Sequence, residues 1–312
     1  FTGNFKGYIS KDDLHRYQAD FLMPSQTVKD GESSEQKTLL FAGAKQLDLL
    51  DGYGKKYKIP LFDRAVDFGV LYIITKPIFE LLTWLYAFAG NFGLAIILLT
   101  LLIKGAMYPL ANKSYVAMNE MRTLQPKIMQ LKERYGDDKV KFQKEMMAIY
   151  RKEKINPASG CLPILIQIPI FFALYKVLFV TIEMRHAPFY GFVQDLSAPD
   201  PTNIFNLFGL IDWTPPGILT LGILSIMMGV TMWMQQQFSP KPTDPIQAKI
   251  LAWMPWIFML IVAGFPTGQG FPAGLIIYWI CSNIITILQQ WSIRARYEKR
   301  KERKATGVAN DA

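Results

Sequence analysis

Residues 91–110 read NFGLAIILLTLLIKGAMYPL, an apolar run long enough to cross a membrane that carries one charged side chain, Lys104. A lysine within a span costs roughly 2.5–3.5 kcal/mol on insertion scales, so something must compensate for it. Either the ammonium reaches the lipid headgroups by snorkelling, or it faces a hydrated space inside the protein. The functional interpretation depends on which of the two holds.

Four more apolar runs follow, and together with the first they predict an all-α membrane protein with five transmembrane helices. The chain is 51% hydrophobic and 13% aromatic, which is typical of this class. The fourth of the five runs, residues 250–265, has 16 residues and would rise about 24 Å, less than the roughly 30 Å hydrocarbon core. Local thinning of the bilayer is therefore expected beside it. The four runs are about 161–180, 217–235, 250–265 and 275–293.

The charges of the loops predict the orientation of these spans. The net charge is +9, and residues 111–158 carry 11 Lys and Arg against 6 Asp and Glu. The tail 294–312 carries 7 against 3, whereas residues 181–216 carry 1 against 4. Basic loops stay in the cytoplasm, so the segment 111–158 and the tail are expected there and the N-terminal region outside.

Two segments precede the first span. Residues 1–68 contain short runs bounded by Gly, Asp and Pro, such as Thr38–Ala42 and Lys56–Phe62, and are expected to be the β-rich end of an extramembrane domain. Residues 69–90 are nearly long enough to span but contain Lys76. An amphipathic helix lying on the membrane is favoured; if the segment spanned instead, residues 1–68 would lie in the cytoplasm.

The segment 111–158 is predicted to form a cytoplasmic helical hairpin, because its apolar side chains recur at helical spacing. Ser114 and Asp138 are of the residue types that cap helices and are expected to begin its two arms. The simplest arrangement packs the arms on each other. A methionine-rich face would also suit an adaptable binding surface.

Polar side chains are concentrated in the cytoplasmic halves of the spans. Thr100 lies one helical turn deeper than Lys104, and Gln167 lies in the second span. If these side chains converge with those of the fifth span, they line a hydrated groove that is open to the cytoplasm and closed outside. Gln167 could instead only join neighbouring helices. The fifth span contributes Ser282 and Asn283, and its glutamines, Gln289 and Gln290, are interpreted as solvated at the interface.

Catalytic and metal-binding patterns are not found in the sequence. It contains no metalloprotease, nucleophile-elbow or nucleotide-binding motif in a suitable context. Its cysteines, Cys161 and Cys281, are 120 residues apart and do not have metal-ligand spacing. The five predicted spans contain no Asp or Glu, which argues against a proton relay. We expect neither an enzyme nor a cofactor or metal.

Several motifs resemble those of the YidC/Oxa/Alb family of membrane protein insertases. They are LQPK at 124–127, GCLP at 160–163, QIPIF at 167–171 and SN at 282–283. The resemblance implies five spans, a cytoplasmic helical hairpin and a hydrophilic groove holding one basic residue. That residue is usually arginine, in a pattern like VRGxxYPL; residues 103–110 read IKGAMYPL, so Lys104 keeps the charge but not the planar fork of arginine.

The resemblance also implies which residues contact substrate. An aromatic pair that is often Tyr-Tyr in the family is Tyr278-Trp279 here. The expected groove residues are Lys104, Thr100, Gln167, Tyr278, Trp279, Ser282 and Asn283.

The implied function is a membrane protein insertase and chaperone of the bacterial inner membrane. Its partners would be nascent membrane proteins, the lipid bilayer, the Sec translocon and the ribosome, the last through the hairpin and the basic tail, but not DNA. The β-rich start would be the end of the periplasmic domain of the Gram-negative form, which also has an N-terminal span, so a truncated form is expected. A small-solute transporter and a structural assembly factor are the alternatives.

Overall fold

The computed structural model divides the chain into two units, residues 1–43 and residues 44–312. The turn of the predicted hairpin at 136–137, Cys161, and the end of the basic tail at 306–312 lie outside the described residues. The structure describes residues 6–11, 17–22, 25–35, 37–135, 138–153, 155–156, 162–213, 215–216, 219–238 and 245–305.

The first unit contains two antiparallel strands, β1 (Lys6–Lys11) and β2 (Tyr17–Leu22). Lys6 lies opposite Leu22, and Lys11 lies opposite Tyr17. This unit is therefore a β-ribbon in the part of the chain that the structure describes.

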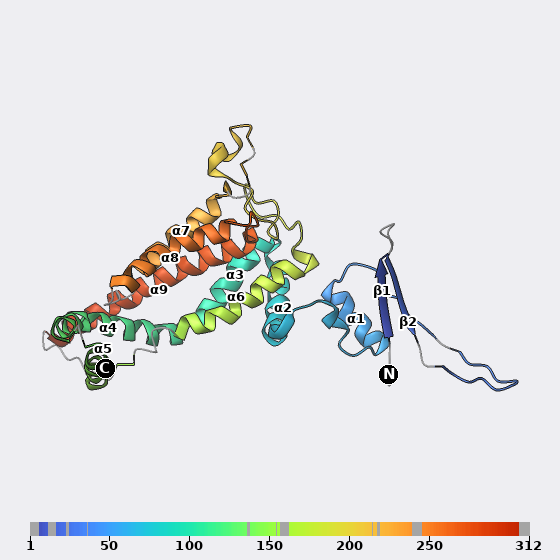
Figure 1. Cartoon of the computed structure of the whole chain (residues 1–312), viewed down its shortest axis with the longest axis horizontal. Coiled ribbons are helices and arrows are strands. Elements are labelled where there is room, and N and C mark those ends of the chain that lie inside the picture. Colours follow the sequence, from blue (N-terminus) through green and yellow to red (C-terminus); the bar gives the residue numbers. More distant parts are fainter. Residues whose placement is uncertain are drawn as a thin grey trace. The chain divides into compact units, whose positions relative to one another are not determined.

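The second unit is helical (Figure 1). The long helices after residue 90 fall on the predicted spans and on the predicted hairpin. The α-helices of the unit are α1 (Leu47–Tyr57), α2 (Tyr72–Ala89), α3 (Phe92–Ala106), α4 (Tyr108–Tyr135), α5 (Lys139–Lys152), α6 (Leu162–Val180), α7 (Ile223–Gln236), α8 (Pro245–Ala263) and α9 (Ala273–Ala305), and its short 3₁₀ helices are η1 (Phe62–Ala65), η2 (Gly69–Leu71), η4 (Ile182–Met184) and η5 (Ile204–Gly209).

The segment before α2 differs from the expectation. A strand was predicted over Lys56–Phe62, but these residues end α1 and lead into η1, so that prediction was wrong. The reason is the spacing of the buried side chains: Leu47 and Leu50 are three residues apart and lie on one face of a helix. Lys58 ends that helix in the left-handed conformation.

Helix α2 packs against α3 and α6. Figure 1 shows it almost end-on, while α3, α6 and α9 are seen from the side, so α2 crosses their direction. The ammonium of Lys76 lies 2.9 Å from Asp63 and 3.1 Å from Asp51, which ties α2 to the preceding segment. The stretch Gly69–Ala89 is also long and apolar enough to cross a membrane.

The helix lengths bear on the number of spans. By length and composition, two helices of the described residues could each cross a membrane, or three if α3 and α4 form one span bent by 64°. Helices α6 and α8 have 19 residues each, and Leu165–Val180 and Ala248–Ala263 are their apolar stretches among the described residues. Helix α9 continues through most of the basic tail to Ala305, which the sequence analysis did not anticipate. The count of five spans stays a prediction.

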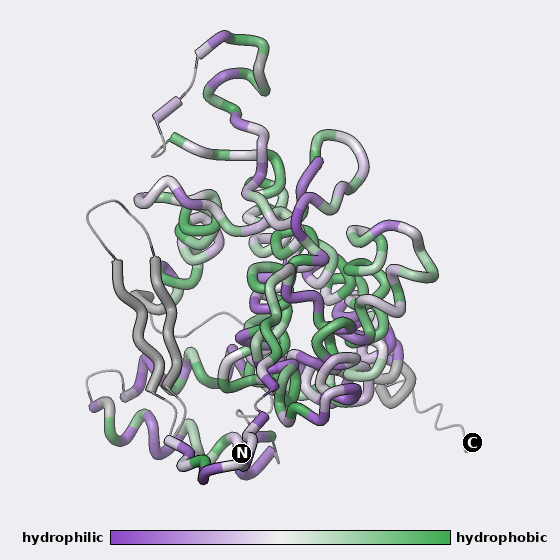
Figure 2. Tube along the Cα trace, turned by 90° about the vertical axis from the view of Figure 1, so that its right-hand side faces the viewer, coloured by the Kyte–Doolittle hydropathy of each residue, from purple (hydrophilic) through white to green (hydrophobic). Residues whose placement is uncertain are grey.

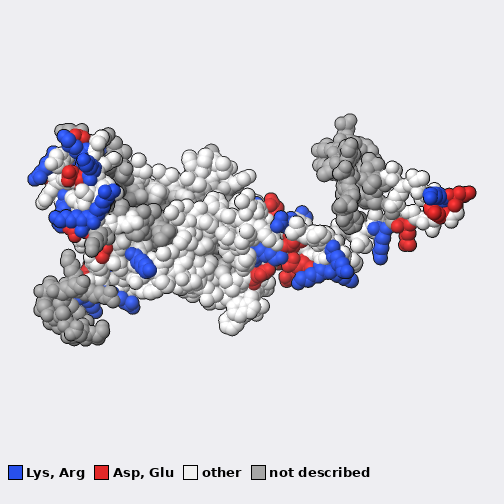
Figure 3. All heavy atoms as spheres, turned by 90° about the horizontal axis from the view of Figure 1, so that it is seen from below, with Lys and Arg blue, Asp and Glu red and all other residues white. Residues whose placement is uncertain are grey.

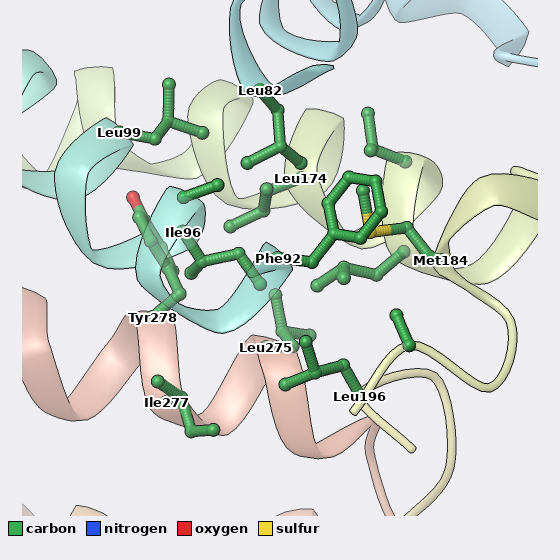
Figure 4. Close-up of a cluster of buried hydrophobic side chains, with 14 of the residues drawn as sticks. Leu82, Phe92, Ile96, Leu99, Leu174, Met184, Leu196, Leu275, Ile277 and Tyr278 are labelled. Carbon is green, nitrogen blue, oxygen red and sulfur yellow. The ribbon is translucent and has the colours of Figure 1, made fainter. Parts of the chain in front are cut away.

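The core lies between α2, α3, α6 and α9 (Figure 4). Leu82 of α2, Ile96 of α3 and Leu174 of α6 are at most 1% exposed. Leu275 and Tyr278 complete it from α9. The consecutive helices α2 and α3 are thus fixed around one apolar centre with α6 and α9, which are distant in the sequence. The polar side chains described below come from three of these helices.

The hairpin of α4 and α5 confirms one predicted cap and contradicts the other. Asp138 caps α5, where its carboxylate accepts a hydrogen bond from the amide of Lys141 at 3.0 Å. Ser114 lies inside α4 and is 1% exposed, because α4 begins at Tyr108 and packs against α9. Figure 3 shows a wide uncharged surface over the helices that ends at the basic side chains of this hairpin.

Candidate functional site

Lys104 lies in the last turn of α3, where three helices meet. Its ammonium donates hydrogen bonds to the amide oxygen of Gln167 on α6, at 3.2 Å, and to the hydroxyl of Thr286 on α9, at 3.1 Å. Both acceptors are neutral. None of the ion pairs found among the described residues involves this ammonium. The charge is therefore solvated by the protein but not neutralised.

Gln167 extends the arrangement to a second buried side chain. Its amide nitrogen donates to the hydroxyl of Tyr278, which is 1% exposed. Gln167 therefore uses both ends of its amide, one toward Lys104 and one toward Tyr278. We call Lys104, Gln167, Tyr278 and Thr286 the Lys104 cluster.

The α9 side of the cluster is a polar stripe with a spacing of four residues. Tyr278, Ser282 and Thr286 share one face of the helix, and all three are at most 5% exposed. Gln290 continues the stripe one turn further and is 7% exposed. A helix face with this spacing can carry polar groups through an otherwise apolar bundle.

The two glutamines at the end of this stripe are not simply solvated, as the sequence analysis had assumed. Gln289 donates from its amide nitrogen to the backbone oxygen of Lys104 at 3.3 Å. The amide oxygen of Gln290 is buried and has no hydrogen-bond partner among the described residues. Tyr115 of α4 is 8% exposed and lies in a buried cluster with Ile293 of α9. The polar stripe thus continues to the point where α4 packs on α9.

Four of the expected groove residues lie outside the Lys104 cluster. One of them, Ser282, lies on the polar stripe, and the other three make different contacts. Thr100 is fully buried and donates its hydroxyl to the backbone oxygen of Ile96, in its own helix, at 2.7 Å. Asn283 donates to the hydroxyl of Thr231 on α7 at 3.1 Å and so joins α9 to that helix.

Trp279, the third, belongs to an aromatic group. Its ring centroid lies 4.7 Å from that of Phe171 on α6 and 4.6 Å from that of Phe258 on α8. The structure therefore brings Lys104, Gln167 and Tyr278 together, with Ser282 on the same stripe as Tyr278.

Thr286 was missed, although the four-residue spacing from Tyr278 through Ser282 could have indicated it. Among the described residues, no group of three or more His, Cys, Asp or Glu side chains could hold a metal ion. The chemistry that the cluster offers is one positive charge that neutral hydrogen-bond acceptors hold in place.

The chain is similar to known proteins along most of its length. Residues 84–301 match the model of the 60Kd inner membrane protein family, and residues 2–81 match that of the YidC periplasmic domain. The chain is 53% identical over 293 residues to the membrane protein insertase YidC of Rickettsia bellii and 52% identical to that of Rickettsia canadensis. Both alignments cover 94% of this chain and 51% of the relative, so the chain spans about half the length of these curated relatives.

A solved structure is also similar. The crystal structure of an active YidC insertase with its first transmembrane domain resolved matches with a TM-score of 0.50 and 26% sequence identity. The match covers 77% of this chain and 51% of that chain. The resemblance inferred from the motifs is confirmed.

Proposed function

Since the chain belongs to the 60Kd inner membrane protein family, that of the YidC insertases, we propose that it inserts hydrophobic segments of new proteins into the bacterial inner membrane. The observation that carries this proposal is the Lys104 cluster. An ammonium held by neutral acceptors between α3, α6 and α9 retains its full attraction for an external carboxylate. A carboxylate already paired with it would remove that attraction.

The proposed mechanism uses this charge within a hydrated groove open to the cytoplasm. Thr100, Asn283 and Trp279 make other contacts and are left out of the proposed groove. The proposed groove residues are Lys104, Gln167, Tyr278, Ser282, Thr286 and Gln290. A carboxylate about 4 Å from the ammonium would gain about 4 kcal/mol at an effective dielectric constant of 20. Such a gain is comparable to the cost of bringing a polar segment partway into a bilayer. The hydrophobic segment would then leave sideways into lipid, where the short apolar run 250–265 favours a thin bilayer.

The proposed topology has five spans, α3 and α6 through α9, with a periplasmic N-terminal region and a cytoplasmic C-terminus. The α4–α5 hairpin and the basic tail would lie in the cytoplasm. The crossing of α2 relative to the other helices supports a surface position for residues 69–90. Residues 1–68 would then be the end of a periplasmic domain, with the β-ribbon in residues 1–43 and the helices α1 and η1 after it.

The proposed partners follow from these surfaces. Nascent membrane proteins would meet the hairpin first, whose exposed Met129 and Met147 suit varied apolar sequences. The ribosome would approach the same basic face, and the Sec translocon would deliver larger substrates laterally.

Insertion into vesicles of a single-span substrate with an acidic external region tests the function. We expect faster insertion with the protein than without it, a several-fold loss with Lys104→Ala and a larger loss with Lys104→Glu. Lys113→Ala is the matched control, because Lys113 is an exposed lysine on the neighbouring helix α4. Equal insertion into vesicles that lack the protein would refute the proposal, and saturable flux of a small solute would favour a transporter.

A further inference from the structure

Residues 204–213, which we call the outer apolar loop, expose an unusual number of large apolar side chains. Leu210 is 86% exposed, and Phe208 is 54% exposed. Elsewhere in the unit, side chains of the same types are buried in the apolar core. The exposed set consists of Phe205, Leu207, Phe208, Leu210, Ile211 and Trp213.

The base of this loop is firmly held. The side chain of Asn203 accepts a hydrogen bond from the amide of Phe205 at 3.1 Å and donates to the backbone oxygen of Leu219 at 2.7 Å. The amide of Ile204 donates to the backbone oxygen of Leu221 at 3.0 Å. The loop is thus anchored at the start of α7, and its exposed tip has a defined position.

The backbone of the tip is strained in a way that keeps apolar side chains outside. Leu207 and Phe208 are consecutive non-glycine residues with φ of 47° and 60°, in the left-handed region. Side chains with a Cβ atom are disfavoured there. Strain of this kind persists only where the surroundings stabilise it, and both of these side chains are exposed in the chain itself.

The composition of the loop indicates what kind of surface covers it. Asp212 is its one charged residue, and it has no Lys or Arg. Attraction to anionic headgroups or to nucleic acid is therefore not its basis for binding. An uncharged apolar tip followed by Trp213 matches the residue types that settle at a membrane–water interface.

The apolar surface of the loop continues into that of the bundle. The hydroxyl of Thr220 donates to the backbone oxygen of Ala263 at 2.9 Å, so the base of the loop lies where α8 ends. Leu219 and Phe265 are exposed beside it, and Ile257 and Ile261 continue the exposed apolar surface along α8. In Figures 1 and 2 the loop stands away from α7–α9 at the top of the molecule.

We propose that the outer apolar loop dips into the interface of the outer leaflet of the bilayer beside α7 and α8. The inference rests on the topology proposed above. A lipid surface covers all six side chains without requiring a complementary protein shape. The loop would act as a lateral anchor that fixes the depth of α7 and α8, which bound the site where the bilayer is expected to be thin.

Spin-label accessibility in proteoliposomes tests this. One label is placed at Leu210→Cys, a second at Ile257→Cys on α8, and a third at Val140→Cys on the hairpin, each with Cys161→Ser and Cys281→Ser. Leu210 and Val140 are both highly exposed, at 86% and 77%, so neither substitution should disturb folding. We expect the label at position 210 to collide more with oxygen than with a water-soluble nickel chelate, as at position 257 and opposite to position 140.

The possible failures are distinguishable. A label at 210 that behaves like the one at 140, while 257 remains in lipid, would overturn the loop proposal and leave the topology intact. A label at 210 shielded from both reagents would also overturn it, because protein would then cover the loop. A label at 257 that is accessible to nickel would refute the spanning arrangement of the proposed function.

Discussion

The ammonium of Lys104 and the hydroxyl of Thr286 lie 3.1 Å apart, although 182 residues separate them in the chain. This contact joins α3 to α9 at the level of the only charged side chain in the segment 91–110. Snorkelling alone would direct the ammonium away from other helices. The contact therefore favours a lysine that faces the interior of the bundle.

Replacing Thr286 with valine should weaken the hold on Lys104. The hydroxyl accepts a hydrogen bond from a charged group, and loss of such a bond costs about 1.5–3 kcal/mol. We expect Thr286→Val to lower insertion several-fold and Thr286→Ser, which keeps the hydroxyl, to retain most of it. Equal activity of the two variants in the vesicle assay would show that the contact does not contribute.

Trp279 should matter for stability more than for charge recognition. Its half-buried ring packs between Phe171 and Phe258, and removal of a fully buried tryptophan costs about 3–5 kcal/mol. We expect Trp279→Ala to lower the free energy of unfolding in detergent by part of that amount, and Trp279→Phe by much less. Trp291→Ala is the control, because Trp291 is 64% exposed on the same helix. A large loss at position 291 as well would mean that exposure does not explain the effect.

Gly222 should tolerate no side chain. A Cβ atom there would overlap the carboxylate of Asp200, which accepts the amide hydrogen of Leu224 at 2.8 Å and so caps α7. We expect Gly222→Ala to reduce the free energy of unfolding by about 1–3 kcal/mol. Gly52 lies in α1 with open space around it, so Gly52→Ala should instead stabilise by about 0.5–1 kcal/mol. Thermal unfolding of both variants measures the contrast, and a stabilised Gly222→Ala would contradict the assigned cap.

Ionisation of Asp63 should make the free energy of unfolding depend on pH. Burial opposes its ionisation, but hydrogen bonds from Tyr72 and Lys76 outweigh burial and hold the pKa of Asp63 below its ordinary value of 3.8. Ionised Asp63 therefore stabilises the fold above that value, and the stabilisation is lost as the pH falls through the lower folded pKa. We expect Asp63→Asn to cost about 1–3 kcal/mol at pH 7 and less at strongly acidic pH.

The control for Asp63→Asn is Asp67→Asn. Asp67 is 81% exposed and 3.8 Å from Lys176, so its loss should cost less than about 1 kcal/mol. A destabilisation by Asp63→Asn that is the same at pH 7 and at strongly acidic pH would show that the charge of Asp63 is not what stabilises the protein.

Much of the helical core and part of the site could be predicted from the sequence. Apolar runs locate helices well, and a lone lysine or glutamine in such a run draws attention because burying it is unfavourable. Lys104 and Gln167 were identified in this way and Tyr278 from the family resemblance, and the structure brings the three together.

Other features depend on tertiary contacts. Thr286 and Gln290 lie toward the polar end of α9, where sequence alone cannot distinguish a buried side chain from a solvated one. Ser114 has the residue type of a cap, but α4 begins six residues earlier, at Tyr108. Thr100 and Trp279 share spans with true members of the Lys104 cluster, yet their rotation about the helix directs them elsewhere.

The most direct test of the central claim is charge-dependent crosslinking to the Lys104 cluster. A single-span substrate carries a photoreactive residue next to its acidic external segment. The crosslinked peptide is mapped on protein with Lys104 intact or changed to Ala or Glu. The variant Lys113→Glu is the control. We expect crosslinks to α3 and α9 around Lys104 and Thr286 that weaken with Lys104→Ala, weaken further with Lys104→Glu, and persist in the control. Crosslinks and insertion that are unchanged in all variants would show that Lys104 takes no part in receiving substrate.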